Sequence, residues 1–301
     1  MPMLLLLIRG SYQVVGTRPE GDTVHFTPAN PAEWNFVGVG GFHSVERNAS
    51  GQGKLRLDAV DTLETHYSRS GPEVSQPPFF AHAARDELLS WLGFTDVQRA
   101  PDETVTAATP ESTPGWILAR SADIGGRCIA MAGRGTPPGN SGTDTMLDVT
   151  RLRTTVNHHL LKTGLAYPTY YSNLFHDDPF QDLRAELTAA VHQAQAAPVK
   201  GLWTKDVTLS GATVTGMSSL TNDVVILPKL FRRLVDFLNL GNTDLSGFPA
   251  FLAQTQDRFL ILSTGQFTTG LDAVVEVTNS NVRMTHPAED LVFEERVFEE
   301  S

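Results

Sequence analysis

The sequence predicts an α+β protein built on a small closed β-barrel and followed by a smaller α+β unit. Segments with strand-like alternation stand before and after one clear amphipathic helix, and two further helices follow the last of these strands. The length of 301 residues also exceeds what one small barrel needs. We therefore place a barrel domain at residues 1–205, a C-terminal α+β domain at 206–287 and an acidic tail at 288–301.

Five segments of the first domain have the composition and alternation of strands. They lie at residues 4–15, 22–26, 54–60, 116–119 and 128–132. The first segment contains six consecutive apolar residues, 3–8, which are too few to span a bilayer and lack the flanks of a secretion signal. We expect these apolar residues to form a buried strand.

About three helices are expected in the same domain. Residues 81–92 carry an apolar stripe and are followed by Gly93, which is typical of a helix end. Residues 156–162 form a second helix, and residues 182–197 form a third that stops before Pro198. The order strands, helix, strands, helix, helix favours a closed barrel with helices packed outside it.

The C-terminal domain mixes both kinds of element. Strands are expected at residues 224–227, 259–262 and 273–277, and a helix at 228–238 begins with a proline in its first turn. The tail from Glu289 carries six acids against one arginine, so we expect it to be solvated or disordered.

Composition limits the classes of function. The net charge of −11 is unusual for a nucleic-acid-binding protein, for which a basic surface is expected. Residues 206–301 hold 13 acids and 6 bases, so the first 205 residues are only mildly acidic and leave room for a local basic groove. The single cysteine, Cys128, excludes an internal disulfide framework and a multi-cysteine zinc site. The lack of a signal or membrane segment favours a cytoplasmic protein.

Three short segments carry the chemistry. Residues 20–23 (EGDT) form a turn into a strand, residues 56–64 (RLDAVDTLE) end a strand, and residues 123–127 (DIGGR) form a turn between strands. Carboxylates that converge at strand ends suit a hard cation such as Ca²⁺, which takes oxygen ligands. Arginines beside them suit a phosphate group, which a guanidinium can bind through two hydrogen bonds.

Alternation along the second segment places Arg56 and Asp58 on one face of the strand. A turn after Val60 would then redirect Asp61 and Glu64. We expect the carboxylates of the segments to converge across the barrel.

The order of these segments resembles that of the staphylococcal nuclease (thermonuclease) family over about residues 5–205. Three later matches extend the resemblance, at Val156-Asn157, at Gly164-Leu165-Ala166 and at Trp203. The resemblance implies an OB-type barrel and a Ca²⁺-dependent nuclease. Such an enzyme would hydrolyse DNA or RNA to 5′-hydroxyl and 3′-phosphate ends.

The resemblance also implies a metal site. Asp22 and Asp61 match the carboxylates that bind Ca²⁺, and Thr62 matches the residue that offers its backbone carbonyl. Glu64 matches the acid that activates or orients the attacking water. A carboxylate in that place can take a proton from water.

The remaining matches concern the substrate. Arg56 and Arg127 match the two arginines that hold the phosphate and stabilise its charge, and Tyr170 falls where the family places an aromatic ring near the nucleotide. Two positions depart from the family pattern, because Leu63 stands where proline is usual and Glu20 replaces an aspartate.

Two other interpretations stay open. The barrel could be a non-catalytic module that binds single-stranded nucleic acid or a protein partner, and the acidic total charge fits a protein partner. Residues 206–301 could regulate the barrel or mediate self-association, and the acidic tail could mimic nucleic acid and occupy the cleft. No membrane association is expected.

Overall fold

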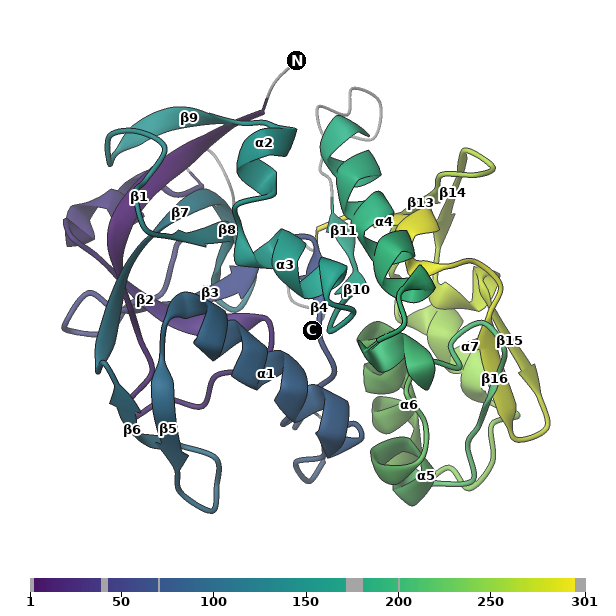
Figure 1. Cartoon of the computed structure of the whole chain (residues 1–301). Coiled ribbons are helices and arrows are strands. Elements are labelled where there is room, and N and C mark those ends of the chain that lie inside the picture. Colours follow the sequence, from purple (N-terminus) through teal and green to yellow (C-terminus); the bar gives the residue numbers. More distant parts are fainter. Residues whose placement is uncertain (1–2, 39–42, 70, 172–180, 200, 296–301) are drawn as a thin grey trace.

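The computed structural model describes residues 3–38, 43–69, 71–171, 181–199 and 201–295. The barrel and the C-terminal unit lie side by side, with α3 (Val156–Lys162) and α4 (Gln181–Ala196) between them (Figure 1). No helix in these ranges is both long and apolar enough to cross a membrane.

Five strands close into a barrel, as the sequence predicts. They are β1 (Met3–Gln13), β2 (Thr23–Pro28), β3 (Gly53–Leu57), β7 (Ser112–Ala122) and β8 (Cys128–Arg134). β1 pairs with both β2 and β7, β2 pairs with β3, and β3 runs parallel to β8, which pairs with β7. The ring β1-β2-β3-β8-β7-β1 is therefore complete, and β9 (Thr143–Leu147) adds to the free edge of β1.

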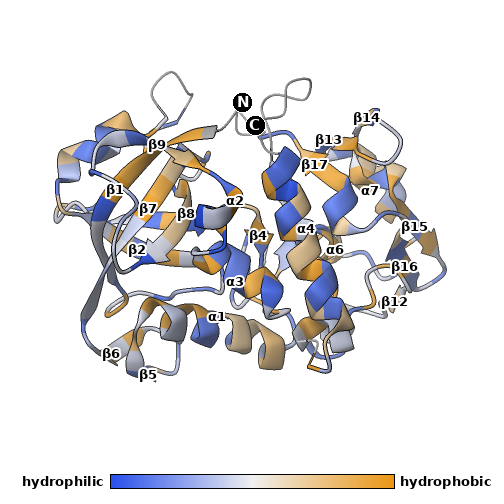
Figure 2. Cartoon of the chain, turned by 45° about the horizontal axis from the view of Figure 1, so that its top comes forward, coloured by the Kyte–Doolittle hydropathy of each residue, from blue (hydrophilic) through white to orange (hydrophobic). Residues whose placement is uncertain are grey.

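Tyr12 organises the interior of the barrel. Its side chain is fully buried, and its hydroxyl donates to the carbonyl oxygens of Trp116 at 2.9 Å and Gly133 at 2.8 Å. A Cβ atom at position 115 would lie 2.2 Å from the Tyr12 ring, so Gly115 is needed for the strands to close around it. Figure 2 shows hydrophobic residues along β7, β8 and β9, and bands of both hydrophilic and hydrophobic residues along α1, α3 and α4.

Four α-helices lie within residues 1–205 of the described chain, one more than expected. They are α1 (Pro78–Leu92), α2 (Val149–Leu152), α3 and α4. Buried leucines of α1 join the barrel core, and its end at Gly93 adopts a φ of 100°. The missed helix, α2, is a single turn capped by Asp148, which is too short to show a helical period.

Short strands complete this half of the molecule. β4 (Val60–Asp61) pairs with β10 (Tyr167–Pro168), and β5 (Thr95–Arg99) pairs with β6 (Val105–Thr109). The sequence predicted none of β5, β6 and β10, and only Val60 of β4. β4 and β10 have two residues each, which is too few to show alternation.

In the described residues from 206 onward, the C-terminal unit has three helices and contributes strands to two small sheets. The helices are α5 (Met217–Asn222), α6 (Pro228–Asn239) and α7 (Phe248–Gln254). One sheet has the order β11 (Tyr170–Tyr171), β17 (Leu291–Phe293), β13 (Arg258–Ile261) and β14 (Gln266–Thr269). The other has the order β12 (Ala212–Thr213), β16 (Asn281–Met284) and β15 (Val275–Thr278). Short 3₁₀ helices lie at Pro31–Phe36, Gly201–Thr204, Leu271–Ala273 and Ala288–Asp290.

Two expectations for this region differ from the structure. Residues 224–227 form no strand but only an isolated bridge between Val225 and Asp206. The predicted solvated tail is wrong as far as residue 295, because β17 is buried and pairs with both β11 and β13. Its apolar residues Leu291, Val292 and Phe293 outweigh the charge of their neighbours. Residues 296–301 lie outside the described ranges.

The two units share one of their hydrophobic cores. The core around α6 includes four residues of the barrel domain, which are Leu63, Ala81, Tyr167 and Leu202. In addition, β11 belongs to the barrel domain by sequence but pairs with β17 of the C-terminal unit. The predicted boundary at residue 205 therefore does not separate two independent cores.

A cavity made in the shared core should destabilise the barrel as well. Leu234 is fully buried in α6, so Leu234→Ala should lower the free energy of unfolding by about 2–5 kcal/mol. Trp34 and Trp116 are buried in the barrel core and Trp91 packs against it, whereas Trp203 packs against both cores. Denaturation followed by tryptophan fluorescence therefore reports mainly the barrel. We expect its midpoint to shift together with that of far-UV circular dichroism. Leu240→Ala, at a side chain that is 68% exposed, is the control. An unmoved fluorescence transition would show that the units unfold independently.

Candidate functional site

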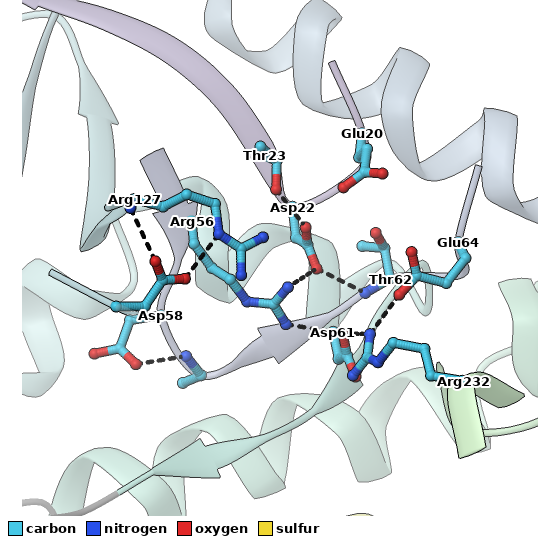
Figure 3. A network of polar contacts seen from close by, with 12 residues as sticks. Glu20, Asp22, Thr23, Arg56, Asp58, Asp61, Thr62, Glu64, Arg127 and Arg232 are labelled. Atoms are coloured by element: carbon cyan, nitrogen blue, oxygen red, sulfur yellow. Dashed lines mark hydrogen bonds and ion pairs between the residues drawn. The ribbon is translucent and has the colours of Figure 1, made fainter. Parts of the chain in front are cut away.

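A cavity of about 930 Å³ lies between the mouth of the barrel and the C-terminal unit. Of the predicted site residues, Arg56, Glu64 and Arg127 line it. Asp22, Asp61 and Thr62 lie beneath its wall and are buried. Figure 3 shows these six side chains, which come from the turn before β2, from β3 and β4, from the loop after β4 and from the turn between β7 and β8.

Gly21 allows the segment 20–23 to pack closely against the segment 56–64. A Cβ atom at position 21 would lie 2.6 Å from the Thr62 hydroxyl oxygen and 2.8 Å from the Ala84 Cβ, so only glycine fits there. The close approach brings the Asp22 carboxylate to the backbone amide of Thr62, which donates to it at 3.3 Å. The other oxygen of Asp22 accepts from the Thr23 hydroxyl at 2.9 Å.

The turn of the second segment falls earlier than predicted. It lies at Asp58 and Ala59, before β4, rather than after Val60, and Ala59 has a φ of 63°. A positive φ is strained for alanine and needs outside support. That support comes from Asn157 on α3, whose side-chain amide donates to the Asp58 carbonyl at 2.8 Å, and from the Thr169 amide, which donates to the Ala59 carbonyl at 3.1 Å.

The turn decides which carboxylate faces Arg56. The guanidinium of Arg56 lies 2.9 Å from the Asp61 carboxylate and 3.6 Å from that of Asp22. Asp58, which alternation places beside Arg56, pairs instead with Arg120 at 2.8 Å. The predicted convergence of Asp22, Asp61 and Arg56 is thus observed, through a different turn.

Asp61 is shared between two arginines. Besides Arg56, it is held by Arg232 of α6, whose two terminal nitrogens lie 3.0 and 3.2 Å from its two oxygens. The same guanidinium contacts the Glu64 carboxylate. Burial alone would raise the pKa of Asp61, but the charges of Arg232 and Arg56 outweigh it and lower that pKa. Asp61 is therefore ionised.

Glu20 and Glu64 are two carboxyl groups of this site that line the cavity. Burial raises the pKa of Glu64, against the opposing charge of Arg232. Burial, together with the charges of Glu64 and Asp22, raises the pKa of Glu20 to about 8. The Glu20 carboxyl also lies 3.2 Å from Nε2 of His66. Two carboxyl groups with unequal surroundings are typical of sites that exchange protons.

Arg127 reaches the cavity from the turn between β7 and β8. Its guanidinium Nε donates to Asp123 at 2.7 Å, and its backbone amide donates to the same carboxylate at 2.9 Å. Gly126 has a φ of 70°, which closes this turn. The Arg127 side chain is 33% exposed, so its remaining nitrogens face the cavity and can meet an anion.

The cavity wall is far less acidic than the whole chain. Eight of the 23 lysines and arginines line it, against seven acids, which gives a formal balance of +1 where the chain carries −11. The basic residues are Arg56, Arg69, Arg120, Arg127, Lys229, Arg232, Arg233 and Arg258. The acids are Glu20, Asp58, Glu64, Asp123, Asp257, Glu294 and Glu295. A local field of this kind can admit an anion that the chain as a whole repels.

Tyr170 does not reach the cavity. Its ring is buried, and its hydroxyl is hydrogen-bonded to Thr188 of α4 at 2.9 Å. Its neighbour Tyr171 lines the cavity instead, because successive residues of β11 point to opposite faces. Tyr171, with Tyr67 and Phe293, is thus among the aromatic rings placed to contact a bound molecule.

Sequence analysis missed three contributors. Arg232 lies beside the apolar stripe of α6, which indicates only a core helix. Gln76 accepts from the Glu64 amide at 3.2 Å and donates to the Ile226 carbonyl at 2.8 Å, which links the site to the C-terminal unit. Asn157 belongs to the Val156-Asn157 match named above, but the sequence predicted no role for its side chain. No local pattern could have revealed Arg232, which is 171 residues from Asp61 in the sequence.

The arrangement does not fit a calcium ion. Both oxygens of Asp61 face guanidinium groups, and both oxygens of Asp22 already accept hydrogen bonds. Within the described ranges, no three His, Cys, Asp or Glu residues are grouped so that they could hold a metal. Calcium needs six to eight oxygen ligands turned toward one point. The carboxylates that the sequence predicts as metal ligands are present, but they form ion pairs with arginines.

No protein family profile matches this chain, and no curated protein matches it either.

Replacing Asn157 should loosen the turn that presents Asp61. Its buried side chain bonds to the Asp58 carbonyl, the Ala130 carbonyl and the Ala132 amide. Asn157→Ala leaves these groups without partners and should lower the free energy of unfolding by about 1–3 kcal/mol. Urea denaturation measures this loss. The exposed Asn140, replaced by alanine, should change stability by less than about 0.5 kcal/mol. Equal stabilities of the two variants would contradict the supporting role of Asn157.

Proposed function

We propose that this chain is a phosphodiesterase that hydrolyses a nucleic-acid strand in the cavity between the barrel and the C-terminal unit. The observation that carries the proposal is the meeting of Glu64, Arg56 and Arg127 at one cavity whose wall is close to neutral in an acidic chain. The closed strand order with a parallel β3–β8 pair is consistent with an OB-type barrel, a fold that often binds oligonucleotides.

The size of the cavity favours a short stretch of single strand. Pockets of roughly 300–1,000 Å³ enclose ligands of drug size, so about 930 Å³ suits one or two nucleotides. Tyr171 lines the wall and can stack on a base. The proposed substrate is therefore a single-stranded segment of DNA or RNA.

The proposed chemistry uses the side chains on the wall. Arg127 and Arg56 would hold the phosphate and stabilise the charge that builds on its oxygens as water attacks. Glu64 would take the proton of that water. The bond from phosphorus to the 5′-oxygen breaks, the departing oxygen takes up a proton, and the products carry 5′-hydroxyl and 3′-phosphate ends.

Calcium remains a prediction from the motifs and takes no part in these steps. A non-catalytic role in binding remains the alternative, and one observation favours it: Arg232 already neutralises the carboxylate of Glu64.

The proposal predicts separate losses for two variants. Glu64→Gln removes the proton acceptor and should slow cleavage of end-labelled single-stranded DNA and RNA by about 10²-fold or more. Arg127→Ala should slow it by about 10²–10³-fold, because charge stabilisation is lost. Arg283, exposed on the β15–β16 hairpin, is the matched control and should keep wild-type rates as Arg283→Ala. Turnover near wild type in Glu64→Gln, or no cleavage by wild type, would refute the hydrolytic role.

The binding step predicts a change in salt dependence. Single-stranded oligonucleotide binding is best measured in the Glu64→Gln background, in which the strand stays intact. Adding Arg127→Ala should lower the slope of log affinity against log salt by about 0.7, because one phosphate contact disappears. Adding Arg283→Ala should leave the slope unchanged. An equal slope in both double variants would place the strand elsewhere on the molecule.

A further inference from the structure

The strongest unexplained feature of the site is the position of Arg232. This residue comes from the C-terminal unit, yet its guanidinium contacts Asp61, which the sequence predicts as a metal ligand, and Glu64, which it predicts as the acid that activates or orients the attacking water (Figure 3). Terminal nitrogens of Arg232 lie 3.0 Å from one oxygen of Asp61 and 3.2 Å from the other, and one of them also contacts Glu64. A single cation thus bridges two carboxylates, as a divalent ion would.

The side chains that form the contact of Arg232 with Asp61 and Glu64 are largely buried. The Asp61 side chain is 1% exposed, the Glu64 side chain 12% and the Arg232 side chain 20%. Charges that are this far from water interact strongly, and a buried carboxylate needs a partner at all times. Asp61 therefore depends on the cations that face it.

The helix that carries Arg232 is anchored on both sides of it. Phe231 is fully buried in the shared core, and the guanidinium of Arg233 is hydrogen-bonded to Asp257 at 2.8 and 2.9 Å. One turn further on, Asp236 accepts from the hydroxyl of Tyr67, a residue of the barrel domain, at 2.9 Å. Arg232 is thus held at Asp61 by neighbours that bury or pair their own side chains.

Arg232 and a divalent ion exclude each other at Asp61. A calcium ion added while Arg232 stays would stand among two guanidinium groups, where like charges repel. A calcium ion that displaces Arg232 would leave a buried guanidinium without its partners.

We propose that Arg232 is the resident cation of this site, and that it occupies the place beside Asp61 and Glu64 in which a calcium ion would otherwise stand. The inference takes Asp61 as a metal ligand from the sequence prediction, and rests on the proposed function only for the role of Glu64. The chain would then neutralise its carboxylates from within, and its C-terminal unit would complete the site.

The test measures calcium binding and stability, not catalysis. Wild type, Arg232→Gln and the control Arg283→Gln are compared by thermal unfolding in chelator and in about 10 mM CaCl₂, a concentration above the weak affinities of roughly 10⁻⁴–10⁻³ M known for calcium sites. Wild type and the control should change their midpoint by less than about 1 °C. Arg232→Gln should unfold earlier in chelator and gain about 3–6 °C from calcium, because calcium then stabilises only the folded form.

Two results would overturn the proposal. One is an equal gain from calcium in wild type and in Arg232→Gln, which would show that Arg232 does not compete. The other is no gain in Arg232→Gln while its circular dichroism remains that of a folded chain, which would show that the carboxylates are no latent calcium site.

A second measurement serves if Arg232→Gln does not fold. Calorimetric titration of wild type with CaCl₂ should show no binding that depends on Asp61, so wild type and Asp61→Asn should give the same heats. Binding in wild type that Asp61→Asn abolishes would overturn the proposal. None of these readouts requires cleavage, so a failure of the phosphodiesterase proposal would leave their outcome unchanged.

Discussion

The buried carboxylate of Asp61 is the constraint on which the rest of the site depends. It is 1% exposed and meets Arg56 from the barrel and Arg232 from the C-terminal unit. Loss of either arginine would leave Asp61 with a single cationic partner in a low-dielectric interior, which is destabilising. The strand pair β4–β10, the strained turn at Ala59 and the placement of α6 all serve to bring these three side chains together.

This constraint makes the C-terminal unit part of the site rather than an appendage. The shared core around α6 takes in Leu63, next to the candidate metal ligand Thr62, and Tyr167, which pairs with Asp61 across β4 and β10. Gln76 ties the backbone of Glu64 to that of Ile226. Apolar packing and polar pairing therefore act on the same few residues, and the cavity exists only because the two units are joined.

The sequence pattern predicted the elements whose formation depends on neighbouring residues in the chain. The barrel strands, α1, α3, α4 and the start of α6 at Pro228 follow from alternation, helical period and proline, and the sequence order of the motifs brought Asp22, Asp61 and Arg56 together as expected. Two of the failures share a physical cause, which is a partner far away in the sequence. β17 was predicted to be solvated because charges surround it, yet its burial is decided by β11 and β13, which lie far away in the sequence. Arg232 looked like the edge of a core stripe because its partner is 171 residues distant.

The same residue types can serve a metal site or an ion-pair network, and the difference lies in which cation faces them. A motif records the carboxylates but not their counter-charge, since that charge arrives through tertiary structure. Here the counter-charge of Asp61 and Glu64 is a guanidinium, while Arg127 keeps nitrogens turned to the cavity. Phosphate binding requires free N–H donors such as those of Arg127, whereas metal binding requires carboxylate oxygens that are not already paired. The observed arrangement therefore supports the anion-binding half of the motif more strongly than its metal-binding half.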